Sequence, residues 1–359
     1  MGWPDNRLQE LLGTELPLIQ APMAGANGAA MAAAVSAAGG LGSLPCAMLD
    51  ADRMRAEAGV IRQQTDRPFN MNFFCHRPAP PDAAAQARWR QRLEGYYREL
   101  GLDPAMEAPA PNRAPFDAAA CDIVEELRPG VVSFHFGLPA PELLDRVRAS
   151  GAKILSSATT VAEARWLDER GCDAIIAQGY EAGGHRGVFL GDDISGQPGT
   201  MALVPQMADA VSVPVIAAGG IADGRGIAAA LMLGAAGVQI GTAYLFTPEA
   251  TISGLHRAAL DGASDDGTAL TNVFSGRPAR GLLNRIMREA GPMAADAPPF
   301  PTAGGALAPL KKAAEADGSA DFTSLWSGQA ASLAPRPMGA GALTRSLMED
   351  ALTRLAAVS

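Results

Sequence analysis

Short apolar, strand-like runs recur along the chain, and each is followed by a polar or glycine-rich loop and then by an Ala/Leu-rich helical pattern. Alternating β and α units of this kind are typical of a parallel sheet covered by helices. Eight such units predict a (β/α)8 TIM barrel, and a doubly wound sheet is the alternative, because both folds share the local pattern. The expected strands are Leu16–Gln20, Gly40–Leu44, Phe69–Phe73, Val131–Phe134, Lys153–Ser156, Ala174–Gln178, Val213–Ala217 and Gly237–Gly241.

Two segments interrupt this repeat. Residues 78–115 are rich in proline and contain an amphipathic pattern around Gln86–Leu100, which predicts an inserted lid on the loop face of the barrel. The barrel is expected to span residues 1–250. A small, mostly helical domain (251–319) then covers the barrel mouth, and a helical tail (320–359) packs on the barrel. The helices expected between strands are Ala29–Ala38, Asp50–Gln64, Ala118–Leu127, Pro141–Ser150, Thr160–Arg170, Met201–Val211 and Gly224–Leu233.

Composition excludes several classes of protein. Hydrophobic residues make up 48% of the 359-residue chain and charged residues 19%, which is typical of a globular protein. A net charge of -9 and the absence of a basic cluster argue against a nucleic-acid partner. The N-terminus lacks a signal-peptide core, and no run is long and apolar enough to span a bilayer. The four cysteines form no CxxC pair, so we expect a cytoplasmic protein without a bound metal.

The segment Gln178–Phe189 places a single histidine, His185, in a glycine-rich loop after an apolar strand. Gly183, Gly184 and Gly187 remove side-chain bulk around it, so a ligand can approach the backbone closely. A histidine in this setting can accept or donate a proton near neutral pH. The loop therefore indicates an active site, and the alternative is a histidine that only caps a turn.

Two further strand ends indicate a phosphate site. Val215–Gly220 is an apolar strand that runs into Gly219 and Gly220, and Asp223 follows as the expected N-cap of a helix. Val238–Thr242 ends the next strand at Gly241 and a hydroxyl. Backbone N–H groups at such helix starts bind phosphate, and in barrels the loops after strands seven and eight often do so. The alternative is that the glycines only tighten a turn.

Amide and thioether side chains end three other strands. Gln20–Met23 closes the first strand with a proline and a flexible thioether that suits a flat ring. Asn72 closes the third strand and Gln178 the sixth. Amides offer both donors and acceptors, which match the edge of an isoalloxazine better than the uniform hydroxyls of a sugar. Together these positions favour flavin mononucleotide (FMN) over a phosphosugar.

Other polar residues near the expected mouth are ambiguous. His76 and His135 flank strand ends and are interpreted as structural. Arg277 and Arg280 either attract an anionic substrate or cap helix carbonyls. His256 is interpreted as a residue on a helix surface.

The chain resembles the class I nitronate monooxygenases, formerly called 2-nitropropane dioxygenases, along nearly its whole length. The matching motifs are Pro17–Gly25, Ala37–Gly42, Asn70–Phe74, Ser133–Gly137, the His185 loop, the two glycine-ended strands, Ser275–Arg280 and Leu325–Gln329. The resemblance implies a (β/α)8 fold, bound FMN, and oxidation of alkyl nitronates such as propionate 3-nitronate by O2 to a carbonyl compound and nitrite. An NAD(P)H-dependent FMN reductase of the quinone or enoyl-thioester type is the alternative.

The same resemblance assigns the site. His185 is expected to face the substrate as the catalytic residue. The expected partners are a small-molecule nitronate and O2, and a homodimer is one candidate for the oligomeric state. The residues expected at the FMN are Ala21, Pro22, Met23, Asn72, Gln178, Gly183, Gly184, Gly219, Gly220, Gln239, Gly241 and Thr242.

Overall fold

The computed structural model describes residues 2–80, 82–107, 109, 113–335 and 338–358. Parts of two predicted segments lie outside the described residues: 81, 108 and 110–112 of the insertion, and 336–337 and 359 of the tail.

The eight predicted strands form one parallel sheet in the order β1-β9-β8-β6-β5-β4-β3-β2. The ends of the sheet meet through a parallel bridge between Ile19 and Leu41. Leu41 N–H donates to the Leu18 carbonyl at 2.9 Å, which closes the barrel. The prediction of a (β/α)8 barrel is therefore confirmed. Its strands are β1 (Leu18–Gln20), β2 (Gly42–Pro45), β3 (Phe69–Phe74), β4 (Val131–His135), β5 (Lys153–Ala158), β6 (Ala174–Gln178), β8 (Val215–Ala218) and β9 (Gly237–Ile240).

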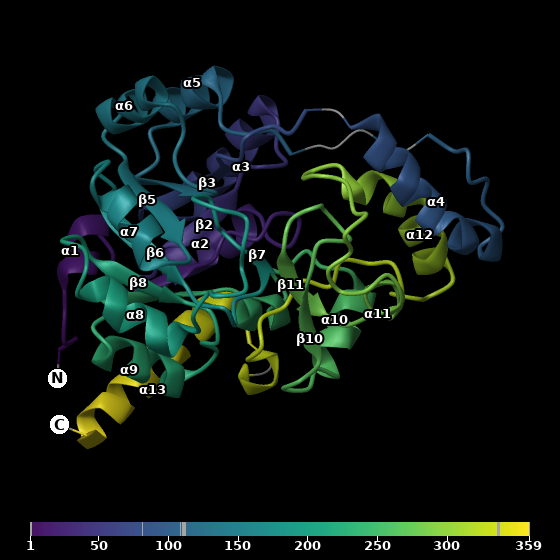
Figure 1. Ribbon diagram of the computed structural model, residues 1–359. Helices are drawn as coiled ribbons and strands as arrows, with labels where there is room; N and C mark the ends of the chain where they lie inside the picture. Colours follow the sequence, from purple (N-terminus) through teal and green to yellow (C-terminus); the bar gives the residue numbers. More distant parts are fainter. Residues whose placement is uncertain (1, 81, 108, 110–112, 336–337, 359) are drawn as a thin grey trace.

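A ring of helices surrounds the barrel (Figure 1). Its last member, α13, packs against α9 and α2 although it lies far beyond β9 in the sequence. The Tyr244 hydroxyl lies 2.7 Å from Thr344 Oγ1 of α13, which ties this helix to the chain leaving β9. The C-terminal helix thus completes the ring of helices around the barrel. The ring consists of α2 (Ala29–Ala37), α3 (Ala51–Gln64), α5 (Ala118–Leu127), α6 (Pro141–Ala149), α7 (Val161–Asp168), α8 (Thr200–Ala208), α9 (Gly224–Met232) and α13 (Ala340–Val358).

Several of these helices begin at a side-chain cap. Asp50 Oδ1 accepts the Arg53 N–H at 2.9 Å, and Asp117 caps α5 in the same way. Asp223, the predicted cap of α9, accepts the N–H groups of Arg225 and Gly226. Each cap satisfies backbone donors that a helix start leaves unpaired, so the βα loops end at defined residues.

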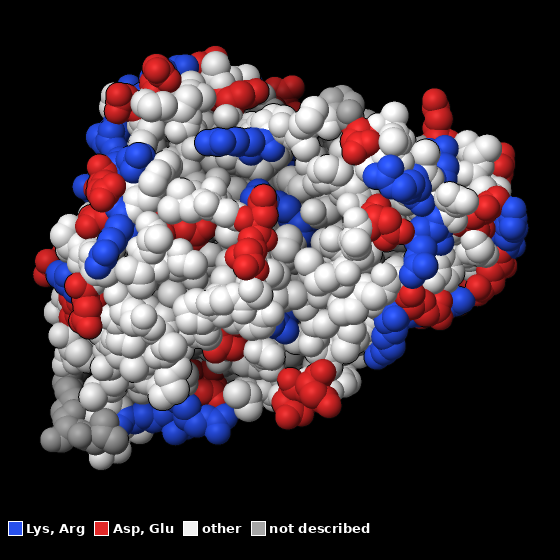
Figure 2. Space-filling view, in the orientation of Figure 1, with Lys and Arg blue, Asp and Glu red and all other residues white. Residues whose placement is uncertain are grey.

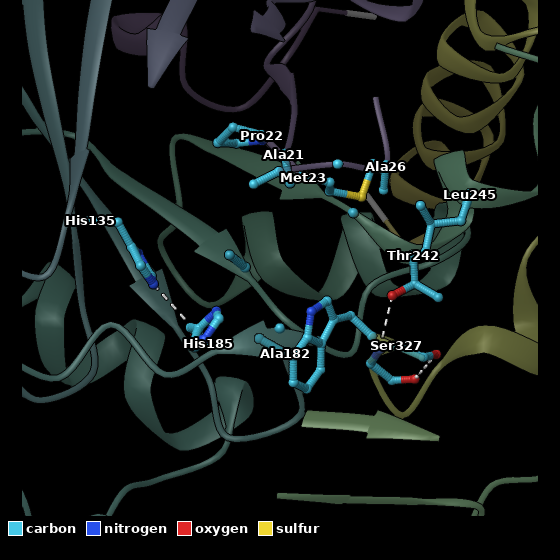
Figure 3. A pocket seen from close by; sticks show the side chains of 18 of the residues that line it. Ala21, Pro22, Met23, Ala26, His135, Ala182, His185, Thr242, Leu245 and Ser327 are labelled. Atoms are coloured by element: carbon cyan, nitrogen blue, oxygen red, sulfur yellow. Dashed lines mark hydrogen bonds between the residues drawn. The ribbon is translucent and has the colours of Figure 1, made fainter. Parts of the chain in front are cut away.

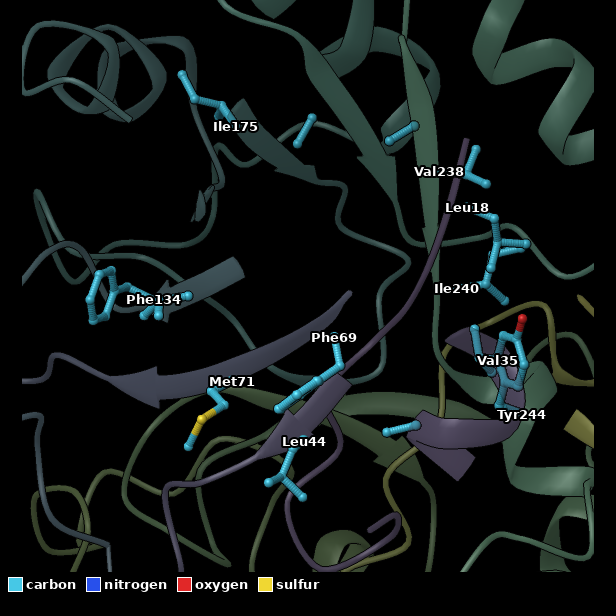
Figure 4. Packing of buried hydrophobic residues seen from close by; sticks show 14 of the residues in the cluster. Leu18, Val35, Leu44, Phe69, Met71, Phe134, Ile175, Val238, Ile240 and Tyr244 are labelled. Carbon is cyan, nitrogen blue, oxygen red and sulfur yellow. The ribbon is translucent and has the colours of Figure 1, made fainter. Parts of the chain in front are cut away.

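Strand side chains alternate between the two faces of the barrel wall. Outward residues such as Leu44 and Val238 pack beneath the helices in the largest hydrophobic cluster (Figure 4). Inward residues such as Ile19 pack with Leu8 of α1 (Arg7–Leu12) in a separate cluster. This apolar plug closes the amino-terminal end of the barrel, so the cavity lies at the carboxyl end.

The insertion and the segment after the barrel share a second core. Trp89 Nε1 of α4 (Ala83–Glu99) donates to the Ala303 carbonyl at 3.0 Å, and α4 packs against α12 (Ala303–Ala316). Tyr97 of α4 donates to the Ala306 carbonyl at 2.6 Å. Figure 1 shows these two helices side by side, away from the barrel. The position of the insertion therefore depends on the segment that follows the barrel.

A small antiparallel sheet was missed by the sequence prediction, which expected 251–319 to be mostly helical. The sheet joins β7 of the His185 loop to β11, and β11 to β10. The expected boundaries at residues 250 and 319 stay predictions. The remaining elements are β7 (Gly184–His185), β10 (Thr268–Thr271), β11 (Ala279–Leu282), α10 (Gly254–Asp261), α11 (Arg285–Glu289) and the 3-10 helices η1 (Thr242–Phe246) and η2 (Ala331–Leu333).

Acidic and basic side chains alternate over the face seen in Figure 2, without a large area of one sign. In the part of the chain that the structure describes, no helix has both the length and the apolarity that a bilayer-spanning segment needs.

Candidate active site

A cavity of about 520 Å³ opens at the carboxyl end of the barrel. This end is where barrel enzymes hold their ligands, and the volume lies within the range of small-molecule sites. Every residue predicted for the site lines this one cavity: Ala21, Pro22, Met23, Asn72, Gln178, Gly183, Gly184, His185, Gly219, Gly220, Gln239, Gly241 and Thr242. The structure thus brings all of the candidates together, and their roles toward a ligand stay predictions.

Inward-facing polar residues at the strand ends form the floor of the cavity. Asn72 Nδ2 donates to Ser133 Oγ at 2.9 Å, so β3 and β4 are linked across the interior. Gln239 of β9 differs, because its Oε1 is buried and has no hydrogen-bond partner among the described residues. A buried acceptor without a partner is costly, so Gln239 Oε1 is available to an N–H group of a ligand.

The loop from Gly219 to Ala222 forms a cradle of backbone N–H groups. No described residue accepts a hydrogen bond from Gly219, Gly220, Ile221 or Ala222, although Ile221 and Ala222 are buried. Gly219 has φ +105°, and a Cβ at that position would lie 2.9 Å from the Ala182 nitrogen. Unpaired buried N–H groups on a loop of this conformation are suited to an anion such as a phosphate.

The helix start beside this loop is not available to the same anion. Asp223 occupies the N–H groups of Arg225 and Gly226, and Asp350 of α13 accepts the Gly224 N–H at 3.1 Å. Sequence reasoning expected the α9 start itself to bind phosphate. The structure instead leaves the N–H groups of the loop before the helix without a partner among the described residues.

A second glycine contact encloses the cavity near Thr242. Gly328 N–H donates to Thr242 Oγ1 at 2.9 Å. A Cβ on Gly183 would lie 2.5 Å from the Gly328 nitrogen, so the His185 loop and the 327–328 loop approach each other at backbone distance. In the view of Figure 3, Met23, Thr242 and Ser327 lie on one side of the cavity and His185 on the other.

His185 is fixed by the strand that carries it and by two side chains. In β7 it pairs with Ala279 of β11, and its Nε2 lies 2.9 Å from Ser275 Oγ. Its carbonyl lies 3.2 Å from His135 Nε2, as the dashed line in Figure 3 shows. The rings of Phe300 and Trp326 each lie 5.5 Å from the imidazole, measured between centroids. The imidazole thus sits in an aromatic enclosure at the cavity wall.

Gln178 holds the His185 loop with both ends of its carboxamide. Its Nε2 donates to the His185 carbonyl at 2.9 Å, and its Oε1 accepts the Gly187 N–H at 2.7 Å. Buried Arg186 binds the Gln178 and Gly179 carbonyls from the other side. Gln178 was predicted to contact the cofactor, and the structure gives it a role in positioning the loop.

The environment of His185 favours its neutral form. Burial lowers the pKa of His185 well below its ordinary value, and the positive charges of Arg113 and Arg277 act in the same direction. Burial also lowers the pKa of His135 and of His76 to about 4. At neutral pH all three imidazoles are therefore uncharged.

The structure contradicts the interpretation of His256 and excludes one of the two alternatives for Arg277 and Arg280. His256 is buried and lines the cavity, with its Nε2 3.1 Å from the Trp326 carbonyl, rather than lying on a helix surface. Arg277 donates to the Val188 carbonyl and Arg280 to the Tyr180 carbonyl, so neither caps a helix. Both arginines instead attach the segment after the barrel to the His185 loop.

Sequence reasoning missed four residues around His185. Ser275 and Trp326 belong to the motifs Ser275–Arg280 and Leu325–Gln329, whose sequences do not indicate that they lie beside His185. Arg113 lines the cavity from the end of the insertion, and Phe300 approaches His185 from a loop of the 251–319 segment. Neither has a local signal, because only the tertiary path of these segments brings them to the barrel mouth.

Comparisons with known proteins show what the chain as a whole is similar to. The profile of the nitronate monooxygenase family matches residues 5–350. The chain is 44% identical to a nitronate monooxygenase of Pseudomonas aeruginosa over 347 residues, which is 96% of this chain and 99% of that protein. It is similar to the solved structure of a nitroalkane oxidase from Streptomyces ansochromogenes, with a TM-score of 0.88, 39% identity, and coverage of 98% of this chain and 100% of that one. FabK from Thermotoga maritima is similar at a TM-score of 0.72 and 26% identity, over 98% of this chain and 97% of that one.

Proposed function

The chain belongs to the nitronate monooxygenase family, and from this premise we propose that it oxidises alkyl nitronates with O2, using bound FMN, to a carbonyl compound and nitrite. Enzymes of this family depend on a flavin. The observation that carries the proposal is the single cavity that joins a cradle of unpaired N–H groups to a neutral imidazole.

The residues present fit FMN. The unpaired N–H groups of Gly219–Ala222 suit its phosphate, and Gly219 and Gly220 adopt φ values of +105° and +71°, which favour glycine. The buried, unpaired Oε1 of Gln239 suits an N–H donor on the ring, and Met23 offers a thioether to a ring face. The bound flavin would supply the redox chemistry, and the protein supplies binding, orientation and electrostatics.

His185 would act as an uncharged group toward the substrate. When its Nε2 carries the proton and donates to Ser275, Nδ1 keeps a lone pair that can remove the carbon-bound proton of a neutral nitroalkane. A preformed nitronate has already lost that proton. The imidazole then serves mainly to orient the nitronate, since a neutral ring carries no charge to pair with it.

Aromatic side chains around His185 would also limit the access of water to it. Phe74, Phe136 and Phe300 pack around His185 with ring centroids 5.5–6.3 Å from the imidazole. Apolar surroundings strengthen the remaining electrostatic interactions inside the site. The same apolar surroundings favour the neutral form of the His185 imidazole.

The rival function is an NAD(P)H-dependent FMN reductase of the quinone or enoyl-thioester type, which would use the same barrel and cradle. The chain is 39% identical to the nitroalkane oxidase structure and 26% identical to FabK, which supports the nitronate reaction. Oxygen uptake and nitrite release should be measured with propyl-1-nitronate, and NADH oxidation with a quinone, on one purified sample. We expect nitrite to form without NADH. Rapid NADH oxidation by a protein that releases no nitrite would assign the rival function instead.

A further inference from the structure

One positively charged residue in the cavity, Arg113, has no negatively charged partner among the described residues. Among the described lining residues, only Arg113, Lys311 and Glu315 carry full charges. Lys311 Nζ lies 3.8 Å from Glu315 Oε1, which also accepts a hydrogen bond from Thr323. Arg113 lines the same cavity and forms no hydrogen bond or ion pair with any described residue, so no carboxylate among these residues neutralises its charge.

Arg113 is held near His185 by the end of the insertion. Three residues after it, Phe116 donates its N–H to the Phe74 carbonyl at 2.7 Å, which anchors the chain at the end of β3. The Phe74 ring lies 6.3 Å from the His185 imidazole. After burial, the charge of Arg113 is the largest influence that lowers the pKa of His185. The free cation and the neutral imidazole therefore share one end of the cavity.

The other arginine of this region is already engaged. Arg277 Nη2 donates to the Val188 carbonyl at 3.0 Å, and its guanidinium lies 4.3 Å from the centroid of the Phe136 ring. Arg277 does not appear among the cavity-lining residues. A half-buried arginine without an anion has lost part of its hydration, so an incoming anion binds it more strongly than it would bind an exposed arginine.

We infer that Arg113 makes this site select an anionic nitronate over its neutral parent nitroalkane, by pairing its guanidinium with the negative charge of the substrate. This inference rests on the proposed function. The nitronate has two oxygens on one nitrogen, which match the two parallel N–H donors of a guanidinium as a carboxylate does. Arg113 acts on the charge of the substrate, and His185 acts on its proton.

The test compares Arg113→Met, Arg113→Lys and the control Arg53→Met, which removes an exposed arginine on α3. The binding probes are butanoate, a carboxylate isostere of a nitronate, and the neutral butanamide, titrated calorimetrically into the flavin-loaded protein. Arg113→Met should weaken butanoate at least about tenfold, the equivalent of about 1.4 kcal/mol, and leave butanamide unchanged. Arg113→Lys should recover most of the loss, and Arg53→Met should match wild type.

Kinetics supply a second readout. Arg113→Met should raise KM for propyl-1-nitronate by about tenfold or more and leave KM for 1-nitropropane unchanged, because only the nitronate is charged before reaction. Absence of butanoate binding in wild type, or an equal loss for butanoate and butanamide, would overturn the inference. If the protein oxidises nitronates but Arg113→Met changes KM equally for nitronate and nitroalkane, the inference about Arg113 is overturned and the proposed function stands. If Arg113→Met weakens butanoate but not butanamide in a protein that does not oxidise nitronates, anion selection by Arg113 is supported and the proposed function is overturned.

Discussion

At the level of single residues, the proposed activity depends on a His185 imidazole that is neutral and held in one orientation. Ser275 binds its Nε2, while Gln178 holds its carbonyl. Both contacts come from residues on other elements, so the histidine alone would not define the site. The sequence identified His185 and Gln178 from their loop, but the partner of each side chain could not be read from local pattern.

His185→Asn should separate proton removal from the later oxidation. Asparagine keeps hydrogen-bonding capacity and removes the proton acceptor, so kcat/KM for 1-nitropropane should fall by about 10²–10⁴-fold, the usual contribution of general-base catalysis. Propyl-1-nitronate should retain much more activity, and the FMN content should stay at the wild-type level. Equal kcat/KM values for wild type and variant on both substrates would remove His185 from the mechanism.

At the scale of elements, the βα loops determine where ligands bind. All eight strands could be predicted, because buried apolar runs and capped helix starts are local signals. β7 could not, since a two-residue strand exists only through its partner, which is β11. A phosphate site at Gly219 and Gly220 stays a prediction, but its donors would have to lie before α9 because Asp223 and Asp350 occupy the helix start.

Gly220→Asp should deplete the protein of FMN. Gly220 has φ +71°, and its added carboxylate would repel a phosphate held by the neighbouring N–H groups. The matched control is Gly151→Asp, because Gly151 has φ +90° with open space around its Cβ position and lies between α6 and β5, on the far end of the barrel. Absorbance of released flavin per protein gives the occupancy. A control that loses FMN as fully as Gly220→Asp would refute the placement of the phosphate.

At the scale of the whole molecule, all four histidines are held in their neutral form. Burial lowers the pKa of His76, His135 and His256 to about 4 and that of His185 well below its ordinary value. The unfolded chain protonates these residues near pH 6.5, so it binds more protons than the folded chain below that pH. Stability contributed by the neutral histidines is therefore complete above pH 6.5 and is lost as the pH falls toward 4.

The free energy of unfolding in urea should consequently drop steeply between pH 6.5 and 4.5. Each additional proton bound by the unfolded chain steepens the slope by about 1.4 kcal/mol per pH unit. His256→Gln should reduce that slope by about one proton relative to wild type at pH 5–6. A free energy of unfolding that stays constant over this range would show that the histidines are not buried in neutral form.

In the proposed reaction a nitronate, rather than a reduced nicotinamide, delivers electrons to a flavin bound in this cavity. The most direct measurement mixes the flavin-loaded protein anaerobically with propyl-1-nitronate or with NADH and follows the flavin absorbance by stopped flow. We expect the nitronate to bleach or shift the flavin spectrum rapidly and NADH to leave the spectrum unchanged. Rapid bleaching by NADH, with no response to the nitronate, would contradict the proposed reaction.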